Sequence, residues 1–228
     1  MLQNDVQGYL YMIADLLVRE TANMGLTLSS ENISAFETFA CELVKWNRKV
    51  NLTAITAENE IVIKHFIDCL HLAPYVQDED ILLDIGSGGG LPVIPLKIVK
   101  PETTMVSVDA VGKKINFQRH IIRLLGLQKI EVLHSRIEDL HKTHAGKFSL
   151  ITSRAFTRLD HFVSLAAPLL AENGRIIAMK GSGADDEIII SNDILKSLGF
   201  TITSHHSYNL PANMGNRVLA VMTSCKPA

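Results

Sequence analysis

A short apolar run that ends in closely spaced glycines is the feature that most constrains how this chain can fold. Residues 81–85 form the run, and three glycines follow it at alternate positions: Gly86, Gly88 and Gly90. Leu91 and Pro92 come next, and proline is tolerated in the first turn of a helix because no amide hydrogen is needed there. Strand, tight turn and helix in this order predict a turn whose backbone approaches a ligand at the edge of a sheet.

From residue 81 onward, short apolar runs alternate with amphipathic stretches, which is typical of a parallel sheet with helices between its strands. The runs predict seven strands, at residues 81–85, 104–108, 129–134, 148–153, 175–180, 201–207 and 218–223. The last two follow a helix expected at 185–198 and are expected to pair as an antiparallel edge. We therefore expect an α/β fold with a mostly parallel seven-stranded sheet.

Residues 1–75 show apolar positions at the three- and four-residue spacing of helices. A first helix would align Val6, Leu10, Ile13, Leu16 and Leu17. A second is expected to begin at Ser29 or Ser30 and to bury a face that ends at Trp46, which we assign to the core rather than to RNA stacking. A third is expected at 60–72. We expect residues 1–75 to form a helical extension packed on a main domain of residues 76–228.

Charge is unevenly distributed along the 228 residues, whose formal net charge is −2. Residues 111–180 hold 12 Lys and Arg against 5 Asp and Glu, so the rest of the chain is acidic. A basic segment favours an anionic partner such as nucleic acid, while a pI near 6.5 argues against indiscriminate binding. Solvated helix faces explain the segment equally well, so composition leaves both interpretations open.

Targeting and metal-binding patterns are not evident in the sequence. There is no apolar stretch of about 18 residues, and acidic residues occupy the region where a signal peptide carries positive charge, so we expect a cytoplasmic protein. Cys41, Cys69 and Cys225 are far apart and favour free thiols. The histidines lack the ligand pattern of a metal site, so we expect no metal. The acidic run at 185–187 is expected to complement a helix N-terminus.

The spacing of the glycines distinguishes two classes of ligand. A dinucleotide-binding turn would place glycine at position 91, which is Leu91 here, whereas this turn is G-x-G-x-G with Asp84 two residues before the first glycine. Asp84 suits the cationic end of S-adenosylmethionine, which has no pyrophosphate to place at a helix N-terminus. Asp109, at the end of the next strand, can accept hydrogen bonds from both ribose hydroxyls. The alternatives are a loop-capping carboxylate for Asp84 and a helix N-cap for Asp109.

If the ligand is the methyl donor S-adenosylmethionine, the segment after the fourth expected strand limits which chemical groups can accept the methyl group. Residues 152–156 read TSRAF and lack the N/D-P-P-Y/F tetrapeptide that holds exocyclic amines. No cysteine lies between Cys69 and Cys225 to form the covalent intermediate of 5-methylpyrimidine synthesis. A ring nitrogen such as guanine N7 needs neither, because its free lone pair attacks without loss of a proton.

Several segments together resemble one family, the bacterial RsmG methyltransferases, formerly called glucose-inhibited division protein B. The segments are WNRKVNLT at 46–53, HFIDCL at 65–70, DIGSGGGLPVIPL at 84–96, DAVGKK at 109–114, SRIE at 135–138 and SRA at 153–155. Val93 departs from the family's usual glycine, and Cys69 from its usual serine. The resemblance implies a class I, Rossmann-like methyltransferase fold with an N-terminal helical extension, and methylation of guanine N7 in 16S ribosomal RNA.

The family resemblance and the glycine turn together predict which residues form the site. Cofactor contacts are expected at Asp84, Gly86, Gly88, Gly90, Leu91, Asp109, Ile137, Glu138 and Arg154. No catalytic acid or base is expected, and three basic residues are candidates for positioning cofactor or RNA: Arg154, Lys180 and Arg217. The partner would be 16S rRNA in the small ribosomal subunit, and we expect a monomer. Two alternatives remain: a methyltransferase of the same fold acting on a small molecule or protein, and a nucleotide-binding regulator without catalysis.

Overall fold

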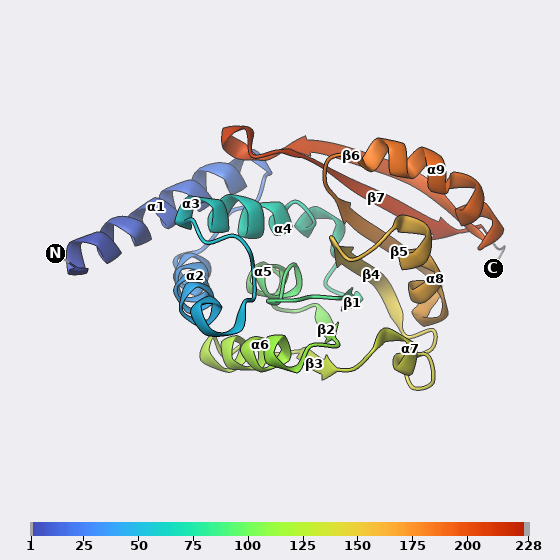
Figure 1. The fold of residues 1–228 in the computed structure, drawn as a ribbon, viewed down its shortest axis with the longest axis horizontal. Helices are drawn as coiled ribbons and strands as arrows, with labels where there is room; N and C mark the ends of the chain where they lie inside the picture. Colours follow the sequence, from blue (N-terminus) through green and yellow to red (C-terminus); the bar gives the residue numbers. More distant parts are fainter. Residues whose placement is uncertain (1, 226–228) are drawn as a thin grey trace.

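A seven-stranded sheet forms the centre of the molecule (Figure 1). The structure is a computed structural model that describes residues 2–225, with side chains described except at 2–11 and 58. The strands lie in the order β3-β2-β1-β4-β5-β7-β6. Their bounds are β1 Ile81–Ile85, β2 Thr104–Asp109, β3 Ile130–His134, β4 Phe148–Arg154, β5 Leu170–Lys180, β6 Phe200–Asn209 and β7 Asn216–Ser224. All seven predicted strands are confirmed.

The sheet is parallel except at its last two strands. Strands β1 to β5 pair in parallel, whereas β7 pairs antiparallel with both β5 and β6, which confirms the expected antiparallel edge. The chain order along the sheet reverses between β1 and β4, and ligands of open α/β sheets bind at the carboxyl ends of strands at such a point. The topology therefore marks one edge of the sheet for a binding site.

Helices cover both faces of the sheet. Their bounds are α1 Leu2–Asn23, α2 Ser30–Val50, α3 Glu58–Ile61, η1 Val62–Ile67, α4 Asp68–Leu70, η2 Ala73–Tyr75, α5 Val93–Val99, α6 Gly112–Leu124, α7 Ile137–Leu140, α8 Leu159–Ala166, η3 Ala167–Leu169, α9 Ala184–Ser197 and η4 Pro211–Asn213. One apolar core joins α1, α2, α5 and α6 to the sheet, and a second joins α7, α8 and α9 to the opposite face. Alternate residues of β1 supply both cores: Leu82 lies in the first and Leu83 in the second.

The N-terminal helices share the first core with the sheet. Ser29 caps α2 by accepting a hydrogen bond from the backbone of Asn32, and the Asn32 side chain donates to the carbonyl of Ile98 at the end of α5 (2.8 Å). Ile13 and Leu17 of α1 are fully buried, whereas the predicted positions Val6 and Leu10 lie outside the described side chains. Figure 1 shows α1 extending beyond the rest of the fold at its N-terminal end.

The predicted third helix is a continuous helical segment from Glu58 to Leu70 with a π-helical turn, η1, in its middle. This turn brings His65, Phe66 and Ile67 into the interior, where all three are buried. The Phe66 ring lies 5.2 Å, between centroids, from the rings of both Phe36 and Phe39 on α2. No helix in the described part of the chain is both long and apolar enough to cross a membrane.

We expect Phe66→Ala to lower the free energy of unfolding by about 3–5 kcal/mol, because the cavity would open between helices that cannot fully collapse around it. Urea denaturation followed by circular dichroism measures the loss. Ile189→Ala, at a position that is 73% exposed on α9, is the matched control and should change stability by less than about 0.5 kcal/mol. Equal denaturation midpoints for the two variants would contradict the packing described here.

Candidate functional site

A cleft of about 490 Å³ lies at the carboxyl ends of β1 to β4. Four of the predicted cofactor residues line it: Gly86, Asp109, Ile137 and Glu138. Its other walls are formed by Ile85, Val108, Ala110, Lys114, Ser135, Arg136, Ala155, Phe156, His161 and Leu165. The topology and the sequence pattern thus converge on the same edge of the sheet.

The glycine turn after β1 requires a backbone conformation that favours glycine. Gly86, Gly88 and Gly90 have φ angles of 71°, 57° and 83°, in the left-handed region. The helix was expected to begin near Leu91 and Pro92, but α5 begins at Val93, and Pro92 is its N-cap. Gly90 and Leu91 are buried beneath the turn. The turn exposes backbone, not side chains, to the cleft.

A buried polar cluster that the sequence did not reveal supports this turn from behind. Gln118 on α6 donates to the hydroxyl of Ser87 (2.9 Å) and to the carbonyl of Gly88 (2.8 Å), and it accepts from Ser107 on β2 (2.5 Å). The Ser87 and Ser107 hydroxyls also contact each other. The sequence offered one indication of this cluster: Gln118 lies one helical turn after the buried Ile115, so a polar side chain falls on the buried face of the helix.

Asp109 holds the turn from the front. Its carboxylate accepts hydrogen bonds from the backbone of Gly88 (2.9 Å) and of Val111 (2.8 Å). Each oxygen retains a second lone pair, so the carboxylate can still accept from two hydroxyls in the cleft. Val111, not Asp109, occupies the N-cap of α6, so the N-cap alternative for Asp109 is wrong.

Asp84 lies fully buried beneath the turn. One carboxylate oxygen accepts the backbone N–H of Val93 (3.2 Å), and the other, Oδ1, has no hydrogen-bond partner within the described chain. Burial, with a smaller effect from the negative charge of Asp109, raises the pKa of Asp84 to about 7 against the opposing effects of Val93 and Arg154. Loop capping accounts for only one of the two oxygens. Val93 itself is fully buried in the first core, so the larger side chain is accommodated there.

Arg154, at the end of β4, does not line the cleft but contacts the helical segment from Glu58 to Leu70. Its guanidinium donates to the carbonyl of Lys64 (2.8 Å), to Asp68 (3.3 Å) and to Nδ1 of His65 (3.3 Å). Nδ1 of His65 also lies 3.2 Å from the carbonyl of Lys64, and Nε2 is hydrogen-bonded with the Thr53 hydroxyl (2.9 Å). Burial and the neighbouring Arg154 lower the pKa of His65 to about 3, which keeps the ring neutral.

Asp68 joins this cluster to the last two strands. Its carboxylate accepts from the Tyr208 hydroxyl (2.9 Å) on β6, and Arg217 on β7 lies 3.5 Å from it. Asp68 and Arg154 form an ion pair whose side chains are 4% and 19% exposed. Three segments singled out in the sequence, at 46–53, 65–70 and 153–155, therefore meet in one hydrogen-bonded cluster, because Thr53 bonds His65 and Arg154 bonds Asp68. Within the first segment, the Asn47 side chain bonds the backbone of Thr53.

Lys180 also has protein partners, since its ammonium donates to the carbonyl of Thr157 (2.6 Å) and to Glu187 (2.8 Å). Neither Lys180 nor Arg217 lines the cleft at the glycine turn. The acidic run at 185–187 lies in the first turn of α9, as predicted. Trp46 packs against Phe117 with ring centroids 5.5 Å apart, which confirms its place at the core.

Further side chains in the cleft were missed by the sequence analysis. Phe156 and His161 project from the segment after β4, and Lys114 and Arg136 add positive charge to the opposite wall. Within the described residues, no group of three or more histidine, cysteine or acidic side chains could hold a metal ion.

Comparison with known proteins decides the family. The family model described as rRNA small subunit methyltransferase G, or GidB, matches residues 32–213. The chain belongs to this family. The protein of that name from Geobacter metallireducens is 50% identical, over 91% of this chain and 94% of the relative, and that from Geotalea uraniireducens is 48% identical over the same shares.

Solved structures support the fold. P. horikoshii TYW2 in complex with MeSAdo aligns with a TM-score of 0.58 at 12% identity, covering 71% of this chain and 63% of that one. The ribosomal protein L11 methylase from Lactobacillus delbrueckii subsp. bulgaricus aligns with a TM-score of 0.56 at 16% identity, covering 72% and 79%. The fold is that of class I methyltransferases that use S-adenosylmethionine.

The raised pKa of Asp84 predicts a pH-dependent stability. The folded protein keeps the carboxyl protonated up to about pH 7, whereas the unfolded chain releases the proton near the ordinary pKa of an aspartate, 3.8. Between these values the folded state binds more protons, so its stability falls as pH rises. We expect Asp84→Asn to become progressively more stable relative to wild type from about pH 4 to 7 and to level off above.

Urea denaturation at several pH values measures this difference. Asp78→Asn, which replaces an exposed carboxylate with the same amide, is the matched control for the substitution itself. A flat profile for Asp84→Asn would mean that Asp84 titrates in the folded protein as it does in the unfolded chain.

Proposed function

We propose that this protein transfers the methyl group of S-adenosylmethionine to N7 of a guanine in 16S ribosomal RNA. The observation that supports this proposal most directly is the cleft at the glycine turn, in a chain that belongs to the rRNA small subunit methyltransferase G family. The family name supports ribosomal RNA as the substrate, and the sequence after β4 supports a ring nitrogen as the acceptor.

The residues of the cleft fit the cofactor. The Asp84 oxygen that has no hydrogen-bond partner lies beneath the turn, where a cationic ligand would favour the ionised form of this carboxyl group. Asp109 faces the cleft with lone pairs free for ribose hydroxyls, and Ile137 offers an apolar surface to a base. We assign Asp84, Gly86, Gly88, Gly90, Leu91, Asp109, Ile137 and Glu138 to this site. Arg154 acts on the cofactor through its charge near Asp84.

The chemistry demands little of the protein beyond alignment. S-adenosylmethionine, when bound, supplies a methyl group to the N7 lone pair as the carbon–sulfur bond breaks and its electron pair stays on sulfur. N7 loses no proton, so the chain needs no general base there. Its residues hold the two reactants in line and exclude water, which is where the rate advantage of such a reaction arises.

Basic side chains around the cleft are suited to the RNA backbone. Lys114 and Arg136 line the cleft, and Arg136, Lys142 and Arg158 are exposed. We propose that they contact phosphates, whereas Arg154, Lys180 and Arg217 position the protein's own loops. The basic stretch 111–180 thereby acquires a function beyond a solvated surface.

We propose further that the protein acts on the small ribosomal subunit as a monomer in the cytoplasm. We also propose that residues 1–75 are an extension to a methyltransferase domain of residues 76–228, although the two share one core.

Asp109→Ala should weaken S-adenosylmethionine binding by about 10- to 100-fold, because two charge-assisted hydrogen bonds to the ribose would be lost. Isothermal titration calorimetry measures the affinity. Glu131→Ala, which removes an exposed carboxylate from β3, is the matched control and should bind as wild type does. An unchanged affinity for a folded Asp109→Ala variant would refute the assignment.

The acceptor is tested by deleting the gene and mapping N7-methylguanine in 16S rRNA by borohydride and aniline cleavage. We expect one cleavage to disappear and to return when purified protein and S-adenosylmethionine are added to subunits from the deletion strain. An unchanged pattern would reject 16S N7 methylation. Release of S-adenosylhomocysteine with a metabolite or protein instead would favour another acceptor, and binding without turnover would favour a regulator.

A further inference from the structure

Phe156 is an exposed aromatic ring inside the cofactor cleft. It is 40% exposed, and it is the only aromatic residue among the large exposed hydrophobic side chains of the described chain. Its ring packs against Gly86, where a Cβ atom would lie 2.5 Å from the ring carbon Cδ2. Glycine at 86 thus leaves room for the ring as well as for the turn. An apolar ring left in water beside a binding site is a surface suited to a flat ligand.

The loop that carries Phe156 is held at both ends. At its start, Arg154 is bonded to Lys64 and Asp68. At its end, Lys180 donates to the carbonyl of Thr157. Between them, Ala155 adopts a left-handed φ of 52°, a conformation that costs energy outside glycine. Fixed ends place the ring reproducibly at the cleft.

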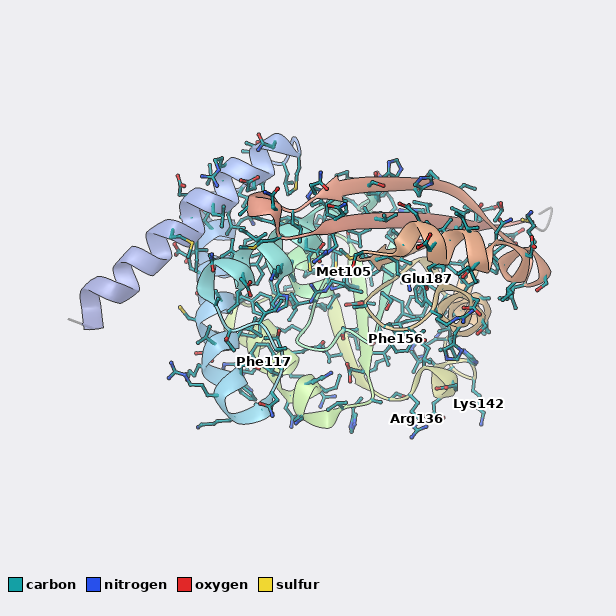
Figure 2. All side chains as sticks on the ribbon, turned by 45° about the horizontal axis from the view of Figure 1, so that its top comes forward. Met105, Phe117, Arg136, Lys142, Phe156 and Glu187 are labelled. Atoms are coloured by element: carbon teal, nitrogen blue, oxygen red, sulfur yellow. The ribbon has the colours of Figure 1, made fainter. Side chains whose placement is uncertain are left out.

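Glu187 adds a second brace to this loop. One of its carboxylate oxygens accepts both from Lys180 (2.8 Å) and from the backbone of Leu159 (2.6 Å). The brace couples the loop to the first turn of α9. Figure 2 labels Phe156 between Glu187 above it and Arg136 below it in that view.

The surroundings of the ring match an RNA base. Lys114 and Arg136 share the cleft with Phe156, and Arg158, two residues further on, is 64% exposed at its side chain. Positive charge for phosphates beside an aromatic surface for a base is the pattern by which proteins bind single-stranded nucleic acid. Phe has no hydrogen-bonding group, so the ring contributes stacking alone.

We propose that Phe156 is the platform on which the acceptor guanine stacks during methyl transfer, with Arg154, Lys180 and Glu187 as the positioning residues that fix its loop. The proposal rests on the proposed function for the identity of the base. The ring lies against the first glycine of the cofactor turn, so a base stacked on it would be held at the mouth of the cofactor cleft.

Kinetics with small subunits from the deletion strain test the platform. With S-adenosylmethionine saturating, Phe156→Ala should lower kcat/KM for the subunit by roughly 5- to 100-fold, the loss expected for one base–aromatic stack. Phe156→Trp should retain most activity because the aromatic surface remains. Ile189→Ala is the control for loss of an exposed apolar side chain elsewhere. Wild-type kcat/KM for Phe156→Ala would overturn the proposal.

Cofactor affinity separates base stacking from contact with the cofactor. Calorimetry should give Phe156→Ala an affinity for S-adenosylmethionine within about twofold of wild type. If affinity falls in the same proportion as kcat/KM, the ring covers the cofactor and the proposal is wrong.

Fluorescence tests stacking even if the wild-type protein methylates another acceptor. The chain has one tryptophan, Trp46, so Trp46→Phe with Phe156→Trp places a single reporter at the platform. Guanosine monophosphate, titrated with S-adenosylhomocysteine present, should quench it saturably, while Trp46→Phe with Ile189→Trp shows only linear collisional quenching. Linear quenching at both positions would overturn the platform. Saturable quenching without 16S rRNA methylation would instead reject only the proposed function.

Discussion

The ion pair between Asp68 and Arg154 is the contact on which the rest of the site depends. Asp68 belongs to the helical segment from Glu58 to Leu70, and Arg154 ends the central strand β4. The same carboxylate receives the Tyr208 hydroxyl from the antiparallel edge. A buried ion pair contributes little net stability, because desolvation opposes the attraction, but its geometry is unique when each charge is also hydrogen-bonded. Here it fixes helices, central strands and edge strands to one another beside the cleft at the glycine turn.

Two clusters of hydrogen-bonded polar side chains hold opposite walls of the cleft in place. Gln118, with Ser87 and Ser107, fixes the glycine turn from within the sheet domain. The cluster around Arg154 fixes the start of the loop on the opposite wall. The walls are therefore set by buried hydrogen bonds, whereas the groups that face the cleft are backbone, carboxylates and an aromatic ring. Such an arrangement suits a reaction that requires alignment more than acid or base catalysis.

The sequence predicted local features and missed those that depend on distant partners. Strand positions followed from apolar runs, and the glycine turn and Asp109 followed from spacing. Strand β5 begins at Leu170 rather than 175, and it includes Asn173, whose φ of 59° is left-handed, beside a register irregularity between Phe148 and Leu150 of the paired strand. Arg154 lies 86 positions from Asp68, so no local pattern could pair them. The glycine turn was visible because its residues are consecutive.

The separation of these partners along the chain has a consequence for biosynthesis. Tyr208 and Asp68 are 140 positions apart, so their contact requires almost the whole polypeptide to have left the ribosome that makes it. Strands β1 to β5 emerge earlier, yet the Asp68 carboxylate lacks the Tyr208 hydroxyl until β6 and β7 have formed. A nascent chain therefore completes the cluster around Asp68 later than the cleft, whose lining residues all lie between Ile85 and Leu165.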